Sequence, residues 1–175
     1  MNNHLWKSAH DIDQVLDQLA EQLRPLLDVP DQPPPLMVGI HTGGVWIAER
    51  LHQVLALPEP LGYLDISFYR DDFTRIGLHP RVSPSHLPVP VDDRRIILVD
   101  DVIQSGRTIR AALNVLFDYG RPSSVYLVVL VGRDGRELPI EPNLVGLHAI
   151  LNPGEHIKLT GPEPLQLELI GEGVQ

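Results

Sequence analysis

Two adjacent carboxylates followed by a turn of small residues form the segment of this chain best suited to chemistry. A strongly apolar run ends in Asp100 and Asp101, a turn is expected over Val102–Gly106, and a helix is expected from Thr108. A helix N-terminus presents unpaired backbone N–H groups and the positive end of the helix dipole, so it attracts anions. Glycine in the turn lets the backbone come close to a phosphate. The segment therefore predicts a site for a phosphorylated ligand.

A ribose 5-phosphate presents complementary groups in the same order. Carboxylates accept hydrogen bonds from vicinal hydroxyls, so we expect Asp100 and Asp101 to hold O2 and O3 of the ribose. The loop Gln104–Thr108 would then bind the 5-phosphate through its backbone N–H groups and the hydroxyls of Ser105 and Thr108.

Two common nucleotide-binding motifs do not fit this segment. A Walker A loop needs Gly-Lys followed by Ser or Thr, and a dinucleotide-binding fingerprint needs G-x-G-x-x-G; the segment has neither. A solvated acidic turn before a capped helix would account for the same residues without a ligand. Strand, acidic pair, small-residue turn and helix in uninterrupted order favour the ribose-phosphate site.

Three helices are expected around this loop. The first begins where Ser8 and Asp11 resemble a capping box, and its apolar residues recur at helical spacing. These residues are Ile12, Val15, Leu16, Leu19 and Leu23. After a loop at His41–Gly44, a second helix is expected over Val45–Leu57 and a third over Thr108–Tyr119.

Apolar runs between the helices predict the strands. They lie at Leu36–Ile40, Leu61–Phe68, Arg95–Val99, Ser124–Val131, Leu144–Leu151 and Leu165–Ile170. Strands that are apolar throughout and alternate with helices are typical of an α/β fold, a parallel sheet with helices on both faces. Ligands of such sheets bind at the carboxyl ends of the strands. We expect one domain over residues 1–175.

The segment Tyr69–Asp93 is different in kind, because it is rich in Pro, Asp, Ser and His and has little periodicity. A loop of this length inside a compact domain is either functional or a linker. Its position between two expected strands favours a mobile cover over the active site, with a short antiparallel hairpin in part of it as an alternative.

Composition excludes several classes of protein. A net charge of −9, from 14 basic and 23 acidic residues, argues against a general nucleic-acid binder, although a local basic face stays open. The absence of cysteine excludes disulfides and thiolate metal sites. The eight histidines show no ligand spacing, so no protein-held metal is expected. We find no apolar run near 18 residues and no secretion signal, and expect a cytoplasmic protein without membrane contact.

Five blocks of the chain carry a resemblance to a known family. They are VGIHTGG (Val38–Gly44), DISFYRDD (Asp65–Asp72), IILVDDVIQSGRTIRAAL (Ile96–Leu113), GRPSS (Gly120–Ser124) and VLVGRDGRELPI (Val129–Ile140). The third resembles the signature of type I phosphoribosyltransferases. YRDD and GRELPI are more specific, and they resemble the PyrR type, the bifunctional pyrimidine-operon regulators and uracil phosphoribosyltransferases.

The resemblance implies a fold, a reaction and partners. The fold is the type I phosphoribosyltransferase fold, a mostly parallel sheet flanked by helices, with a long flexible loop and a small C-terminal hood. The reaction is uracil plus 5-phosphoribosyl 1-diphosphate (PRPP) giving UMP plus diphosphate, with Mg²⁺ carried by PRPP. Family members also associate, so a homo-oligomer is expected.

The resemblance also assigns roles to residues. Asp100 and Asp101 are implied to act on the ribose, and Arg70 is a candidate catalytic contact of the diphosphate. The implied PRPP and UMP contacts are Thr42, Gly43, Asp100, Asp101, Val102, Gln104, Ser105, Gly106, Arg107 and Thr108. Val131 and Arg133 are implied to line the uracil pocket. Surface ion pairs of Arg70 with Asp71 and Asp72, and of Arg133 with Asp134, are the plain alternatives.

Two departures from the family pattern bear on function. Gly43 stands where active relatives usually carry Arg or Lys, which removes a cation beside the diphosphate and predicts weak catalysis. Asp17 and Glu21 on the first helix, and Glu141 after GRELPI, would repel RNA, so we expect the family's RNA attenuation to be lost. The alternative function is a non-catalytic regulator of pyrimidine genes that senses UMP or PRPP.

Overall fold

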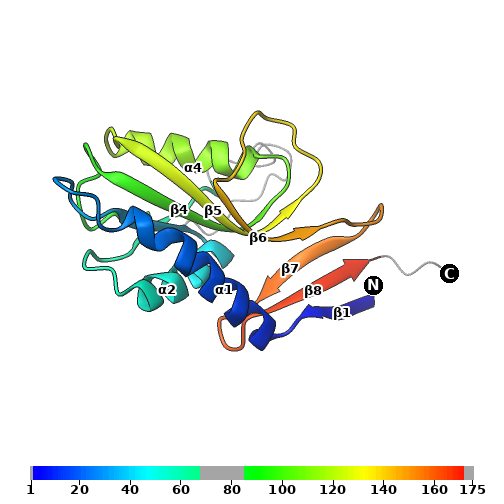
Figure 1. Cartoon of the computed structure of the whole chain (residues 1–175). Helices are drawn as coiled ribbons and strands as arrows, with labels where there is room; N and C mark the ends of the chain where they lie inside the picture. Colours follow the sequence, from blue (N-terminus) through cyan, green and yellow to red (C-terminus); the bar gives the residue numbers. More distant parts are fainter. Residues whose placement is uncertain (1, 68–84, 172–175) are drawn as a thin grey trace.

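The computed structural model describes residues 2–67 and 85–171, and its centre is a five-stranded sheet (Figure 1). The strands run in the order β3-β2-β4-β5-β6, and every neighbouring pair is parallel. Their bounds are β2 Leu36–Ile40, β3 Gly62–Leu64, β4 Arg95–Ile103, β5 Ser124–Arg133 and β6 Leu144–Ala149. The predicted α/β fold with a parallel sheet is confirmed.

Helices cover both faces of this sheet (Figure 1). On one face lie α1 (Ala9–Leu23), followed by the short 3-10 turn Arg24–Leu26, and α2 (Gly43–Leu55); on the other lies α4 (Arg107–Asp118). Each face has its own buried apolar cluster. None of the described helices is long and apolar enough to cross a membrane.

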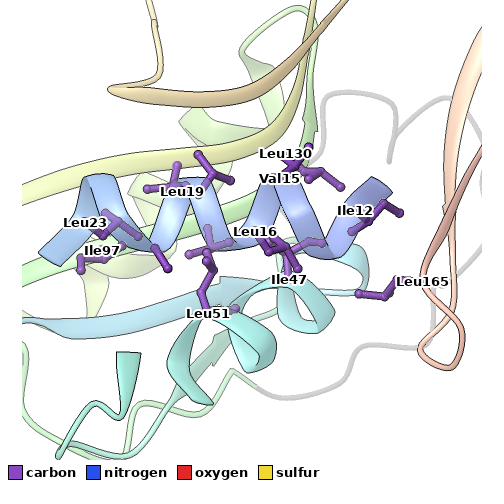
Figure 2. Close-up of a cluster of buried hydrophobic side chains, with 14 of the residues drawn as sticks. Ile12, Val15, Leu16, Leu19, Leu23, Ile47, Leu51, Ile97, Leu130 and Leu165 are labelled. Carbon is purple, nitrogen blue, oxygen red and sulfur yellow. The ribbon is translucent and has the colours of Figure 1, made fainter. Parts of the chain in front are cut away.

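Helix α1 has the local structure that its sequence predicts. The Ser8 hydroxyl accepts a hydrogen bond from the Asp11 backbone N–H at 3.2 Å, and the Asp11 carboxylate accepts one from the Ser8 N–H at 2.9 Å. These bonds hold the pKa of Asp11 below its usual range. The predicted apolar stripe is buried, and Figure 2 shows it meeting Ile47 and Leu51 of α2 and Leu130 of β5.

A second, antiparallel sheet lies beyond the carboxyl end of β6 (Figure 1). It has the order β1-β8-β7, with β1 Asn2–Lys7, β7 His156–Thr160 and β8 Gln166–Gly171. The expected C-terminal hood is therefore built from both chain ends, since Asn3 pairs with Ile170. The sequence predicted neither β1 nor β7, because these strands are short and much of each is exposed.

Several predicted boundaries were wrong. Helix α2 begins at Gly43 rather than at Val45, and β3 is shorter than the strand predicted over Leu61–Phe68. Strand β4 continues past Val99 to Ile103, because these residues keep pairing with β5. Most of the loop predicted over Tyr69–Asp93, namely residues 69–84, lies outside the described residues. In its described part, His86 forms an antiparallel bridge with Tyr63.

Candidate active site

The acidic pair lies inside β4, whereas the sequence placed it at the end of the strand, directly before the turn expected over Val102–Gly106. The Asp100 side chain is only 4% exposed, and its Oδ1 accepts a hydrogen bond from the backbone N–H of Asp101 at 2.9 Å. The Oδ1 of Asp101 accepts one from the N–H of Val102 at 2.8 Å. Backbone donors thus fix one oxygen of each carboxylate, while Oδ2 of Asp101 faces Gly43.

A three-residue turn, Gln104–Gly106, joins β4 to α4. Gly106 has φ 89°, a left-handed conformation that glycine adopts without steric cost, and it is the N-cap of α4. Because glycine brings no side chain, it does not cap the first N–H groups of the helix. Ser105 Oγ accepts a hydrogen bond from the Arg107 N–H at 3.1 Å, and Thr108 lies in the first helical turn. The predicted phosphate loop therefore has the geometry of an anion-binding helix start.

The GRELPI segment supports this loop, a contact that the sequence did not predict. The backbone N–H groups of Glu137 and Leu138 donate to the Ser105 carbonyl at 3.0 and 3.1 Å. The Arg107 guanidinium pairs with the Glu137 carboxylate at 2.6 Å. Arg136 donates to the carbonyl of Gln104. The sequence marked GRELPI as a specific motif, but it did not predict that this segment contacts the phosphate loop.

Arg136 also links this support to Glu141. Its Nε and one terminal nitrogen donate to the two carboxylate oxygens of Glu141 at 2.9 and 3.1 Å. The hydrogen bond from Arg136 lowers the pKa of Glu141 below its ordinary value. The carboxylate is thereby held ionised beside the loop that carries the GRELPI motif.

A second loop meets the acidic pair from β2. The peptide bond between His41 and Thr42 is cis, and α2 begins at Gly43. A Cβ atom on Gly43 would lie 2.2 Å from Oδ2 of Asp101, and one on Gly44 would lie 2.6 Å from the carbonyl oxygen of Val99. Both glycines therefore allow a close approach to β4. The structure brings the predicted diphosphate loop and ribose carboxylates together.

A pocket of about 590 Å³ opens at the carboxyl ends of β5 and β6. Its lining residues are Gly132, Arg133, Asp134, Gly135, Arg136, Glu141, Pro142, Val145, His148, Ala149 and Ile150. Arg133 Nε is buried and has no hydrogen-bond partner within the described part of the chain. The Val131 side chain, by contrast, is fully buried in the apolar cluster beneath α1, so only its backbone could serve a ligand.

Two further predictions concern Arg70 and the metal. Arg70 and its neighbours Tyr69 and Asp71 lie outside the described residues, so the role of Arg70 stays a prediction. Within residues 2–67 and 85–171, no group of three or more acidic or histidine side chains could hold a metal ion by itself. Asp100 and Asp101 nevertheless supply the oxygen atoms that Mg²⁺ prefers.

Comparison with other proteins shows the family to which this chain belongs. The model of the phosphoribosyl transferase domain matches residues 6–161. The bifunctional protein PyrR of Nitrosococcus oceani is 57% identical over 160 residues, which cover 90% of each chain. The protein of the same name from Pseudomonas paraeruginosa is 57% identical over 155 residues, covering 89% of this chain and 91% of its own.

Solved structures share the fold at lower identity. A purine phosphoribosyltransferase from Pyrococcus horikoshii has a TM-score of 0.60 and 24% identity, covering 79% of this chain and 82% of its own. A hypoxanthine phosphoribosyltransferase from Staphylococcus aureus has a TM-score of 0.65 and 18% identity, covering 88% and 80%. At these identities the likeness concerns the fold alone.

Proposed function

We propose a function for this chain from its family: it belongs to the phosphoribosyl transferase family and, within it, to the bifunctional PyrR type. The carboxyl edge of its parallel sheet converts uracil and PRPP into UMP and diphosphate. The chain is a pyrimidine regulator with uracil phosphoribosyltransferase activity. One observation carries the assignment of the site: the acidic pair of β4 is followed by a short turn that ends in Gly106, an N-cap residue without a side chain to cap α4.

Each part of PRPP has a matching element at this edge. The ribose hydroxyls would donate to Asp100 and Asp101, and the 5-phosphate would accept from the turn Gln104–Gly106 and from the side chains of Arg107 and Thr108. The diphosphate would lie against Thr42–Gly44 at the start of α2. Magnesium would come with the diphosphate and neutralise part of its charge, with Asp101 as the nearest carboxylate.

The reaction needs no nucleophilic side chain. The bond between C1 of the ribose and the diphosphate oxygen breaks, a bond from C1 to N1 of uracil forms, and the N1 proton is released. Positive charge develops on the ribosyl ring as the diphosphate leaves, and the carboxylates of Asp100 and Asp101 would stabilise it. Excluding water from C1 protects the cation-like state from hydrolysis.

The base would enter the pocket at the ends of β5 and β6. Arg133 supports this placement because its Nε is buried beside the pocket without a partner among the described residues. A guanidinium donates hydrogen bonds, and both oxygens of uracil accept them. Arg133 is therefore proposed to read a carbonyl oxygen of uracil.

Turnover can be measured with purified protein, PRPP, Mg²⁺ and labelled uracil by following UMP. We expect UMP to form, and Arg133→Ala to raise the KM for uracil by about tenfold through the loss of a charge-assisted hydrogen bond. Arg24→Ala, which removes an exposed arginine in the 3-10 turn after α1, is the control. UMP binding without turnover would instead identify a non-catalytic sensor.

Regulation is proposed to proceed without the family's RNA contact. Asp17 and Glu21 are exposed on α1, and Glu141 is 71% exposed, although Arg24 and Arg136 offset part of the charge of Glu21 and Glu141. Carboxylates on these surfaces repel phosphate groups. Filter binding to a pyrimidine-operon leader transcript should detect no tight complex at physiological salt, and nanomolar binding would overturn this proposal.

A further inference from the structure

The GRELPI segment packs against one side of the phosphate turn. A Cβ atom on Gly106 would lie 3.4 Å from Cβ of Ile140 and 3.6 Å from Cδ of Arg136. At the other end of the turn, a Cβ atom on Gly135 would lie 3.2 Å from Nε2 of Gln104. The turn and the segment are therefore in contact at both ends, and one side of the turn is closed to a ligand.

Two carbonyl groups of the turn are held by this segment. The Arg136 guanidinium donates to the Gln104 carbonyl, and two backbone N–H groups of the segment donate to the Ser105 carbonyl. Both peptide bonds that follow these carbonyls are trans. In a planar trans peptide the N–H points away from its carbonyl, so the N–H groups of Ser105 and Gly106 face away from the GRELPI segment. They are turned toward the open side of the turn.

The orientation of these two peptide groups decides whether the turn attracts or repels a phosphate. With the carbonyls held, the turn presents N–H donors at the start of α4, where the helix dipole also favours an anion. A rotated peptide would present a carbonyl oxygen there instead. Of the three donors that hold the carbonyls, only Arg136 uses a side chain, so it is the donor that a substitution removes.

The Arg136 side chain is itself fixed by Glu141. Both carboxylate oxygens of Glu141 accept hydrogen bonds from the guanidinium, at 2.9 and 3.1 Å. This carboxylate offsets the positive charge, so the hydrogen bond of Arg136 to Gln104 matters more than its attraction for a distant anion. Arg136 also lines the pocket at the ends of β5 and β6, and a direct contact with the base is the competing role.

We propose that Arg136 is a positioning residue for the 5-phosphate: it touches no part of the ligand, and it acts by holding the Gln104 carbonyl so that the N–H groups of the turn face the phosphate. The proposal rests on the proposed function, since it assumes that the 5-phosphate lies at Gln104–Gly106. Ligands that carry the phosphate should depend on Arg136, and ligands without it should not.

The test separates the phosphate from the base. Ribose 5-phosphate, UMP and uridine are titrated calorimetrically into the full chain. Arg136→Met keeps a long side chain without a donor, and it should weaken ribose 5-phosphate and UMP by about tenfold and uridine by less than about threefold. Arg136→Lys keeps a charged donor and should recover most of the affinity for both phosphorylated ligands. Arg24→Met removes another arginine that pairs with a glutamate, and it should change none of the three affinities.

A double variant separates position from charge. Arg136→Met leaves the charge of Glu141 unbalanced, and a negative charge near the turn also weakens phosphate binding. Combining it with Glu141→Gln restores the original net charge, and the double variant should stay about tenfold weaker for ribose 5-phosphate. Full recovery of affinity in the double variant would assign the loss to charge and overturn the proposal.

The other outcomes are equally distinct. A loss confined to uridine and UMP would place Arg136 against the base, and equal losses of all three ligands would indicate a structural role; either result overturns the proposal. If the unmodified protein binds ribose 5-phosphate and Arg136→Met binds it equally well, the proposal fails alone. If the unmodified protein binds neither ribose 5-phosphate nor UMP, the proposed function fails with it.

Discussion

The phosphate loop after β4 and the diphosphate loop after β2 have the same plan, a strand followed by a glycine turn and a helix start, but they differ in what surrounds them. Gln104–Gly106 is supported by the GRELPI segment and adds hydroxyls and Arg107 to its backbone donors. Thr42–Gly44 has two buried glycines pressed against β4 and a carboxylate over one of them. The first loop therefore has side-chain donors beside its backbone, whereas the second has backbone groups beside a carboxylate.

A carboxylate lies near each loop, and this sharpens the difference. Glu137 neutralises Arg107 in a pair whose side chains are 46% and 57% exposed, so solvent screens it and a phosphate can displace it. Asp101 faces the backbone of Gly43 and is held by the Val102 N–H. An anion at the first loop would compete with Glu137 for Arg107, whereas an anion at the second loop would lie beside the Asp101 carboxylate.

The largest effect on affinity is expected from a substitution at the proposed site for the ribose, which PRPP and UMP share. Asp100→Ala removes a buried carboxylate, and it also leaves the Asp101 N–H without its acceptor. PRPP and UMP should both weaken by about 100-fold, since hydrogen bonds to charged groups contribute about 1.5–3 kcal/mol. Calorimetry of both ligands measures this. Unchanged affinities would show that Asp100 does not bind the ribose, and the comparison of the two loops would then lose the ligand group that connects them.

The next effect separates the two loops. Gly44→Ala places a methyl group against the β4 backbone, which cannot move aside, so the diphosphate loop must shift. Overpacking of this kind costs about 1–3 kcal/mol, and we expect a lower Tm and about tenfold weaker PRPP binding, with UMP binding nearly unchanged.

A matched glycine variant controls for the added methyl group. At Gly171 an added Cβ would meet its nearest neighbour, Cγ of Glu155, at 3.4 Å, an ordinary contact. Gly171→Ala should therefore change neither Tm nor PRPP affinity. Equal losses of UMP and PRPP in Gly44→Ala would show that the two loops do not act separately.

A smaller gain is expected when the competing anion of the first loop is removed. Glu137→Gln abolishes the ion pair with Arg107, and UMP affinity should rise by about threefold because the 5-phosphate no longer competes with a carboxylate. Tm should change little, since exposed ion pairs contribute little to stability. Glu21→Gln, which breaks the exposed pair with Arg24 at 2.7 Å, is the control for both measurements. Weaker UMP binding in Glu137→Gln would mean that the pair positions Arg107 for the phosphate.

The smallest effect is expected on the pH dependence of Tm, through the pair of Arg136 and Glu141 that supports the first loop. Arg136 lowers the pKa of Glu141 in the folded chain, so the pair contributes stability above the ordinary pKa of 4.5 and loses it as the pH falls through the lowered value. The Tm of the unmodified protein should exceed that of Glu141→Gln slightly at neutral pH, and the difference should vanish in acid. A difference that persists in acid would point to a contact other than the ion pair.

The sequence predicted what depends on neighbouring residues. The capping box of Ser8 and Asp11, the apolar stripe of α1 and the order of acidic pair, turn and helix are local, because hydrogen bonds and helical periodicity join residues a few positions apart. The resemblance of five motifs added the family. These features predicted a ribose-phosphate site at the carboxyl end of the strand that became β4.

Only the tertiary structure decided which distant segments touch. The pairing of β1 with β8, the contact of Glu137 with Arg107 and the position of Asp101 over Gly43 join residues from separate elements. Such approaches follow from how main chains pack in the sheet, and no local pattern records them. From the sequence, Gly43 is a position where a cationic residue of active relatives is missing. The fold shows that it is also the space in which the second carboxylate of the acidic pair lies.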